Sequence, residues 1–506
     1  DELVQRAHET GGEVMAMAAP NSSLAYVRND EAPRLPPPPS TVGLRGWLLK
    51  NLFSSIGDSI VTVVFGLLAV WILWQAFEFA ILQAVWTGAD REACTGENVG
   101  ACWPLVVAKF PQWIYGFFPI DERWRVNICF LVGAAALIPM LMPSAPYKVW
   151  NALFLLIVFP LLALILLTGG NFNFNLASYV KLVSFMALVA SAIPLIVFGI
   201  EDGIARNKLG LAFAGVGLVL WLASFAMDIP FGGLSIAILF AGAAGLSIAA
   251  ALTGSGQASM PVLKGCAAML AGLLFAMLLL DADFGLVPVE TQQWGGLTVT
   301  LVVSITGIVA SLPLGIILAL GRRSQMPIVK TLCITFIEVI RGVPLITVLF
   351  MASVMLPLFL PPGTSFDKLL RALIGVALFS SAYMAEVVRG GLQAIGKGQY
   401  EGAQALGLSY WQMMAKIVLP QALKISIPNI VGNFISLFQD TTLVLIIGLF
   451  DLLGIVQAGL RDANWASASS APTGYFAVAM MFWVFCFGMS RYSVFTERRL
   501  ATGHKR

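Results

Sequence analysis

The residues with the clearest chemical potential in this chain are charged groups inside long apolar runs. Glu338 and Arg341 are three positions apart, and Glu386 and Arg389 repeat that spacing. Residues three apart lie on one helix face, so each pair is expected to form an ion pair. Because a charge inside a bilayer costs about 2.5–3.5 kcal/mol on insertion scales, such residues face protein or a water-filled path. They are candidates either for ion pairs between helices or for contact with a polar solute.

A second group of polar side chains lies in the late apolar runs, and its chemistry suits a zwitterion. The densest run consists of Gln439, Asp440, Thr441 and Thr442. Amides and hydroxyls of this kind can bind the ammonium and carboxylate groups of an amino acid. Further candidates for the same path are Asn429, Asn433, Thr300 and Ser304. For each hydroxyl taken singly, a hydrogen bond to its own helix backbone is the simpler interpretation.

A polar insert, EGAQALGLSYWQMMAKIVLP, occupies residues 401–420 between two apolar runs. Ser409 is a good N-cap, and Pro420 is expected to end the short helix that follows it. The apolar positions of this helix recur at helical spacing and are Trp411, Met414 and Val418. An apolar helix face outside the membrane favours a partner protein with a groove, to which Glu401 would add a charge. The alternative is an amphipathic helix lying on the bilayer.

Composition excludes several other kinds of site. Both histidines, His8 and His504, stand near the chain ends, so the apolar body has no His-based metal site and lacks the usual general base. The sequence has no G-x-x-x-x-G-K-[ST] loop, so ATP binding by that route is excluded. The net charge of +3 is too small to indicate nucleic-acid binding. A membrane enzyme is disfavoured because no nucleophile, base and acid cluster together.

The six cysteines fall into two groups. Four stand in apolar runs, where they are expected to act as small hydrophobic residues: Cys129, Cys266, Cys333 and Cys486. Cys94 and Cys102 instead share one polar loop, REACTGENVGACW. A disulfide is expected to close this loop if it faces an oxidising compartment. The alternative is a pair of free thiols.

The elements that must position these residues are membrane-spanning helices. The 506 residues are 58% hydrophobic and only 11% charged, whereas soluble proteins average about 25% charged residues. The chain is therefore predicted to be an all-α polytopic membrane protein. Twelve apolar runs approach the roughly 20 residues that a span needs: 58–83, 126–143, 149–168, 179–199, 209–227, 233–253, 263–281, 296–320, 328–360, 368–390, 424–448 and 474–494. The sequence Gly342-Val343-Pro344 predicts a break or kink within 328–360.

Basic residues predict which side each loop faces. Arg45 and Lys50 precede the first span, which puts the N-terminus in the cytoplasm, and alternate counting also puts the C-terminus there. The segment 391–423 then faces the cytoplasm. Lys368 and Arg371 do not fit the pattern, because they are basic residues at the outer end of one span. One long loop, 84–125, is expected outside. Its aromatic half suits a segment lying on the outer surface, with candidate anchors Trp103, Trp113, Tyr115 and Trp124.

Polarity divides the chain into four regions. Residues 1–43 include the run Pro36–Pro39, carry no secretory signal and are predicted to be a disordered cytoplasmic tail. Residues 44–290 hold about seven spans rich in small residues, which allow close helix packing in lipid. Residues 291–495 hold the last five spans and nearly all the candidate site residues. Residues 496–506 form a second cytoplasmic tail.

The insert at 401–420 resembles the EAA loop of ABC importer permeases. Its matching positions are Glu401, Ala403, Gly407, Ile417, Leu419 and Pro420, while Gly402 replaces the first Ala of the motif. Stretches such as FIEVIRGVPLITVLF and FQDTTLVLIIG extend the resemblance over about 291–495. They are similar to the polar-amino-acid branch, and above all to the larger permease of general L-amino-acid or glutamate/glutamine/aspartate/asparagine importers.

The resemblance implies a permease that moves polar L-amino acids delivered by a periplasmic binding protein across a bacterial inner membrane. It also implies a type I core of five helices, a second homologous permease subunit and a cytoplasmic ATPase dimer that holds ATP and Mg. The chain itself would be no enzyme and would carry no cofactor. The EAA loop would form coupling helices that dock on the ATPase through Glu401, Gly402, Ala403, Gly407, Ser409, Trp411, Met414, Ile417, Leu419 and Pro420. In this family a lysine often stands where Gln439 stands, so a basic substrate contact does not carry over. The residues alone leave open an ion-gradient-driven secondary transporter, with Glu338 and Glu386 as its buried ionisable groups.

Overall fold

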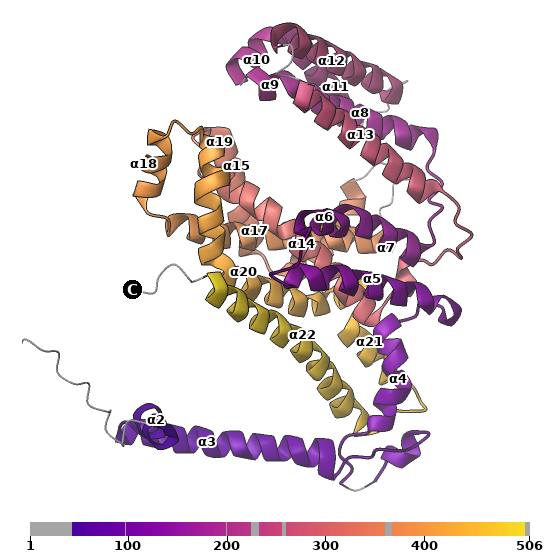
Figure 1. Ribbon diagram of the computed structural model, residues 1–506. Helices are drawn as coiled ribbons and strands as arrows, with labels where there is room; N and C mark the ends of the chain where they lie inside the picture. The colour runs from indigo at the N-terminus through magenta and orange to yellow at the C-terminus, as the bar shows by residue number, and fades with distance from the viewer. Residues whose placement is uncertain are drawn as a thin grey trace, which may run out of the picture. The chain divides into compact units, whose positions relative to one another are not determined.

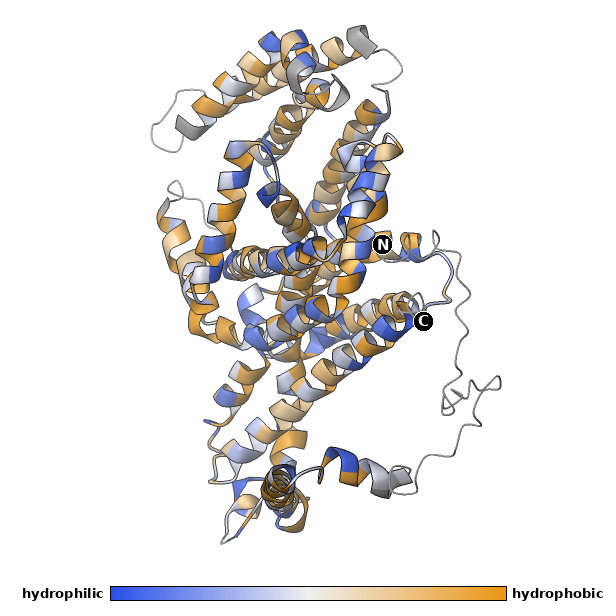
Figure 2. Ribbon diagram, turned by 90° about the vertical axis from the view of Figure 1, so that its left-hand side faces the viewer, coloured by the Kyte–Doolittle hydropathy of each residue, from blue (hydrophilic) through white to orange (hydrophobic). Residues whose placement is uncertain are grey.

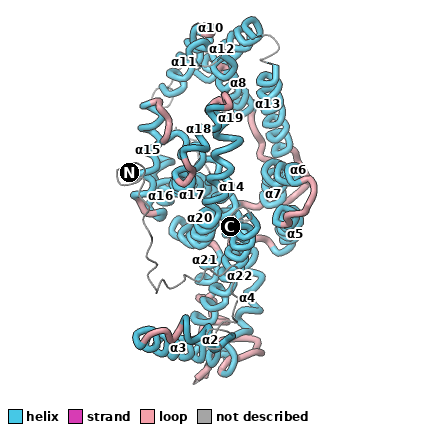
Figure 3. Tube along the Cα trace, turned by 60° about the vertical axis from the view of Figure 1, so that its left-hand side comes forward, coloured by secondary structure: helices cyan, strands magenta, loops and turns pink. Residues whose placement is uncertain are grey.

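The computed structural model describes residues 43–96, 98–198, 200–223, 232–255, 260–359 and 367–500. The tail predicted at 1–43, including Pro36–Pro39, lies outside these ranges except for Gly43, and so does 501–506 of the second tail. All regular elements in the described ranges are helices, as predicted, and none of the described residues belongs to a strand (Figure 3).

Ten described helices are long and apolar enough to cross a membrane, or eleven if one bent pair is a single span. Apolar residues run along most of their length (Figure 2). The expected number was twelve, and the difference lies at 209–227. Residues 224–227 of that expected span lie outside the described ranges, and the described part, within α11 (Lys208–Ala223), counts as a shorter apolar helix. The predicted break in 328–360 is confirmed, since α15 (Pro327–Gly342) and the helical stretch Leu345–Leu358 meet at a bend of 105°. Pro344 lacks the N–H that a continuous helix needs there.

The chain forms two compact units, Asp1–Phe77 and Glu78–Arg506. The first contains α2 (Gly43–Asn51) and the membrane-spanning α3 (Ile56–Phe77). Apart from α11 and α15, the α-helices described in the second unit are α4 (Trp103–Tyr115), α5 (Arg123–Leu141), α6 (Lys148–Leu153), α7 (Phe159–Thr168), α8 (Leu176–Ala190), α9 (Ile193–Phe198), α10 (Ile200–Arg206), α12 (Gly232–Ser255), α13 (Met260–Asp281), α14 (Gly296–Arg322), α16 (Leu345–Phe350), α17 (Lys368–Gln393), α18 (Lys397–Ala405), α19 (Tyr410–Met413), α20 (Leu419–Asp440), α21 (Leu452–Gly459) and α22 (Ser470–Leu500).

The late helices pack closely because glycines stand where they cross. α17 packs on both α14 and α20, and α20 packs on α22. A Cβ on Gly307 of α14 would lie 2.8 Å from Leu437 and 2.9 Å from Val376. A Cβ on Gly391 of α17 would lie 2.5 Å from the carbonyl oxygen of Ala422. Small residues at such crossings let helix backbones approach in lipid.

Of the four aromatic anchors expected on the outer surface, Trp124 is 46% exposed and Trp103 and Tyr115 are half-buried, but Trp113 is instead part of the packed core. Its helix α4 packs against α14, α21 and α22, and Trp113 is only 2% exposed. Gly116 and Gly296 have positive φ angles of 66° and 60°, and a Cβ on Gly296 would lie 2.0 Å from the carbonyl oxygen of Trp113. These glycines let the end of α4 lie against the start of α14, which places Trp113 among apolar side chains.

The cysteine loop and the helix α4 that follows it are bonded to α22 and to the connection between α21 and α22. Cys94 and Cys102 form a disulfide, with their Cα atoms 5.7 Å apart, and the backbone N–H of Cys102 donates to the Thr473 hydroxyl at 2.9 Å. Lys109 of α4 forms an ion pair with Asp462. Hydrogen bonding to Lys109 lowers the pKa of Asp462, so its carboxylate stays ionised to a lower pH than that of an isolated aspartate.

Candidate functional site

The predicted EAA-like segment is built from two short helices that follow α17. α18 and α19 lie beyond the ends of α17 and α20 (Figure 1). Gly407 stands in the turn between them with φ +69°, a conformation that favours glycine. Gly402, which replaces the first Ala of the motif, faces open space, because a Cβ there would meet nothing within 4 Å. The departure from the motif therefore has no steric consequence within this chain.

The end of the segment differs from the prediction. Ser409 caps α19 in a capping box with Gln412, which confirms the predicted N-cap. Pro420, however, does not end a helix. It occupies the first turn of α20, and the π-helical residues Met414–Val418 join α19 to α20 without a break. Pro420 lies inside this continuous helix, and the π-helical turn just before it, where the regular hydrogen-bond spacing already changes, accommodates the missing N–H, so the helix can run on into the span.

The predicted apolar face of the segment is divided between the core and solvent. Met414 and Val418 are buried against Ala403. They therefore pack α18 against α20 and are not exposed to a partner protein. Trp411 is 71% exposed and Leu406 is 77% exposed. The part of the segment that is free to meet another protein is therefore its tip, where Glu401 and Gly407 are also exposed.

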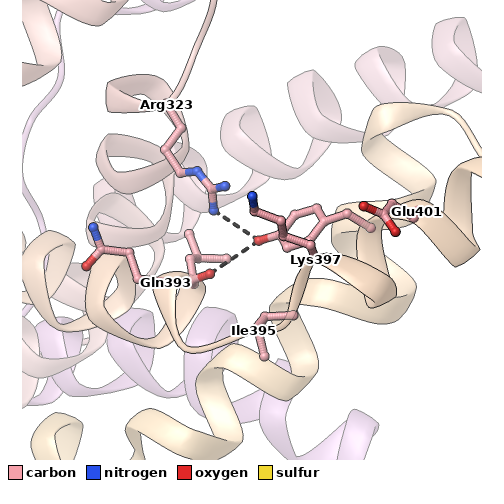
Figure 4. Close-up of a pocket in the computed structure, with 7 residues that line it drawn as sticks. Arg323, Gln393, Ile395, Lys397 and Glu401 are labelled. Atoms are coloured by element: carbon pink, nitrogen blue, oxygen red, sulfur yellow. Dashed lines mark hydrogen bonds between the residues drawn. The ribbon is translucent and has the colours of Figure 1, made fainter. Parts of the chain in front are cut away.

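Beside this tip lies an open pocket of about 330 Å³ (Figure 4). It is lined by Arg323, Leu392, Gln393, Ile395, Lys397, Tyr400 and Glu401. The Arg323 guanidinium donates to the Tyr400 hydroxyl at 3.1 Å, and that hydroxyl donates to the Leu392 carbonyl at 3.3 Å. Arg323 also lies 5.5 Å from the centre of the Tyr400 ring. The pocket thus joins the ends of α14, α17 and α18.

A cluster of five charged residues lies near the same ends of the helices. Glu386 contacts Arg322 at 2.7 Å, Arg389 at 2.6 Å and Arg341 at 3.7 Å. Glu338 contacts Arg322 at 2.9 Å. The predicted pair of Glu386 and Arg389 is confirmed. The predicted pair of Glu338 and Arg341 is wrong, because both side chains reach neighbouring helices instead of each other.

The other predicted pathway residues are not gathered in one place. Thr300 and Ser304 are buried and donate to backbone carbonyls of their own helix. Thr441 does the same with the carbonyl of Phe438 at 2.8 Å. Gln439 and Thr442 line an open pocket of about 250 Å³. The remaining three lie on α20: Asn429 is exposed, and Asn433 and Asp440 are half-buried.

Sequence reasoning missed Asp451. It is fully buried at the start of α21, where its carboxylate accepts from the backbone N–H of Gly454 at 2.9 Å and of Leu453 at 3.2 Å. Burial raises the pKa of Asp451 to about 6, although these hydrogen bonds oppose the rise. An aspartate before an apolar run is an N-cap signal that could have identified it. Arg322, Arg323 and Tyr400 were missed because only the fold brings them to their partners.

Comparison with known proteins identifies the family. Residues 311–502 match the family of binding-protein-dependent transport system inner membrane components. The chain is 40% identical over 461 residues to the inner membrane amino-acid ABC transporter permease protein YhdY of Escherichia coli, covering 90% of this chain and 93% of that protein.

Two further relatives are similar over different lengths of the chain. The glutamate/glutamine/aspartate/asparagine transport system permease protein BztC of Rhodobacter capsulatus is 40% identical over 495 residues, which cover 96% of this chain and 100% of that protein. A glutamate/aspartate import permease protein, GltK of Escherichia coli, is 34% identical over 35% of this chain and 83% of its own length.

These relatives are inner-membrane permeases, so the chain is a multi-pass inner-membrane transport protein. A permease is not the subunit that hydrolyses ATP, so the chain is not an enzyme. This assignment replaces the alternative of an ion-gradient-driven transporter. The chain belongs to the family of inner-membrane permease components of binding-protein-dependent ABC transporters.

Proposed function

We propose that the chain is the permease subunit of an ATP-driven importer of polar L-amino acids such as Glu, Gln, Asp and Asn, delivered by a periplasmic binding protein. The observation that carries this proposal is the identity of 40% with BztC along the whole of that protein. The amide and hydroxyl side chains of the late helices suit solutes that carry both a carboxylate and an ammonium group.

The tip of the EAA-like segment is the proposed docking site for a cytoplasmic ATPase dimer. Leu406 and Trp411 are exposed apolar side chains, and Glu401 beside them is an exposed carboxylate. Apolar residues rimmed by charge are typical of protein contact sites. The basic residues of the loops support a cytoplasmic position for this tip and for both chain ends. ATP and Mg would be held by that partner.

The proposed substrate path runs along α20 and includes its amide and hydroxyl side chains. Gln439 and Thr442 line an open pocket. The Gln439 amide donates to Cys486 Sγ at 3.8 Å and the Thr442 hydroxyl donates to the Gln439 carbonyl at 3.1 Å, so a solute or a neighbouring subunit would bind their remaining lone pairs and N–H or replace these bonds. We place a second homologous permease subunit against this side, so that the two chains together enclose the path. The domain that performs transport is then 291–495, with 44–290 as an additional membrane region.

The docking role predicts the effect of a charge reversal at the tip. Glu401→Lys should abolish most of the ATP hydrolysis that substrate-loaded binding protein stimulates, because the exposed carboxylate no longer meets a basic residue of the ATPase. The measurement is ATPase activity of the complex reconstituted in liposomes, with Glu497→Lys as the control. Glu497→Lys reverses the charge of an exposed carboxylate of α22 outside the EAA-like segment, so it should behave as the unmodified chain. Full stimulation in Glu401→Lys would refute the docking role.

A further inference from the structure

We propose that Arg322 and Arg323 are positioning residues that transmit movement of the EAA-like segment to the membrane spans. The proposal rests on the docking role given above, because it concerns how a displacement of that segment by the ATPase reaches the membrane spans. The two arginines are consecutive in sequence at the end of α14, yet their side chains bond different helices.

Arg323 holds the segment. Its guanidinium bonds the Tyr400 hydroxyl of α18 at 3.1 Å and lies over the Tyr400 ring at 5.5 Å (Figure 4). The same hydroxyl bonds the last turn of α17 through the Leu392 carbonyl at 3.3 Å. One aromatic side chain of the docking segment is thus held by both α14 and α17. The guanidinium is a rigid fork of donors, so one N–H can donate to the hydroxyl while the charged carbon stays near the ring, and the more flexible ammonium of a lysine would not fix both contacts.

The Arg322 side chain connects α14 to two neighbouring helices. Its guanidinium contacts Glu386 of α17 at 2.7 Å and Glu338 of α15 at 2.9 Å. Glu386 in turn contacts Arg389 at 2.6 Å. α15 leads directly to the break at Pro344, so Arg322 connects the end of α14 both to α17 and to the helix that bends.

The backbone between the two arginines is fixed. The N–H of Arg323 bonds the carbonyl of Leu320 at 3.0 Å, which caps α14. A displacement of Tyr400 is therefore carried into the last turn of α14 and from there to Glu338 and Glu386. A second polar link, from Gln421 of α20 to Gln399 of α18 at 3.0 Å, ties the segment to its own following helix and reaches neither α14 nor α15.

The exposure of these contacts allows their role to be tested without unfolding the protein. The side chain of Arg322 is 24% exposed and that of Glu338 is 55% exposed. Glu386 is only 14% exposed, but it keeps Arg341 and Arg389 as partners when Arg322 is removed. Ion pairs that water reaches contribute little to folding stability. Removing them should leave the subunit folded and assembled while weakening the connection between the segment and the spans.

The test compares transport with ATP hydrolysis in the full complex reconstituted with its ATPase and binding protein. In Arg323→Ala and Arg322→Ala, we expect amino-acid uptake per ATP hydrolysed to fall at least about fivefold, the lower range of coupling between distant sites. Tyr400→Phe keeps the ring and loses only the bonds of the hydroxyl, so it should show a smaller fall. Arg323→Lys should rescue less than half of the loss in Arg323→Ala.

Copurification of the ATPase and thermal stability are measured alongside, since neither should change. Lys330→Gln is the matched control, because it removes an exposed cation of α15 near the same end of the molecule, and its uptake per ATP should match that of the unmodified chain. An unchanged ratio in both arginine variants overturns the proposal. If an arginine variant fails to assemble, the Tyr400→Phe variant provides the test. An unchanged uptake per ATP in Tyr400→Phe would also overturn the proposal. Failure of the unmodified complex to take up amino acids with ATP would instead overturn the proposed function.

Discussion

At the scale of single residues, Asp451 combines two opposing effects. Its carboxylate caps α21, which stabilises the helix, but it is fully buried, which penalises its charge. The folded pKa of about 6 lies above the ordinary value of 3.8. Between these values the folded chain binds more protons than the unfolded chain, so the free energy of unfolding contributed by this group decreases as pH rises through that window.

Asp451→Asn should therefore remove part of the pH dependence of stability. The amide oxygen can still cap the helix and carries no charge to bury, so we expect the melting temperature at pH 7 to be equal or higher. As pH rises from 4 to 6, the free energy of unfolding of the unmodified chain should fall by roughly 3 kcal/mol, and that of the variant should not. Thermal melts in detergent at a series of pH values measure this, with the exposed Asp121→Asn as control. Parallel pH profiles for Asp451→Asn and the unmodified chain would contradict the assignment.

At the scale of helices, two adjacent glycines of α17 have different surroundings. A Cβ on Gly391 would lie 2.1 Å from the Ser426 hydroxyl and 2.5 Å from the Ala422 carbonyl, whereas a Cβ on Gly390 would meet nothing within 4 Å. Gly391→Ala should push α20 away from α17 and cost about 1–3 kcal/mol, as overpacking does. Gly390→Ala should be neutral or stabilise by about 0.5–1 kcal/mol, since alanine favours a helix. Equal melting temperatures of the two variants would show that the helices do not cross there.

Sequence predicted the helices better than it predicted their contacts. Hydropathy located nearly all of the spans because bilayer thickness fixes how long each apolar run must be. It misplaced Pro420 as a helix end because a proline in a first turn looks like a proline that stops a helix. It also treated Trp113 as a surface anchor, since an aromatic near a membrane edge gives the same signal whether lipid or protein covers it. The cluster around Glu386 was only half predicted because spacing along one helix says nothing about an arginine on the next.

At the scale of the whole molecule, the disulfide loop and the EAA-like segment are expected on opposite sides of the membrane. The disulfide of Cys94 and Cys102 requires an oxidising compartment, while the proposed ATPase partner needs cytoplasmic ATP. Membrane-impermeant maleimide should therefore label Glu92→Cys in intact cells and label Glu401→Cys only after permeabilisation. Both positions are exposed in this chain, so the membrane alone limits access of the reagent when the chain is expressed without its ATPase partner.

The experiment is done with the four free cysteines, Cys129, Cys266, Cys333 and Cys486, replaced by serine, and uptake is measured first to show that the chain remains active. Cys94 and Cys102 stay in place, because their bonded sulfurs do not react with maleimide. Gln404→Cys, an exposed position on α18, is a second reporter that should follow Glu401→Cys. Labelling of both α18 reporters in intact cells would place the segment outside, where no ATPase can reach it. The docking role and the transmission through Arg322 and Arg323 would then fail together, whereas the family assignment, which rests on the similarity of the whole chain, would stand.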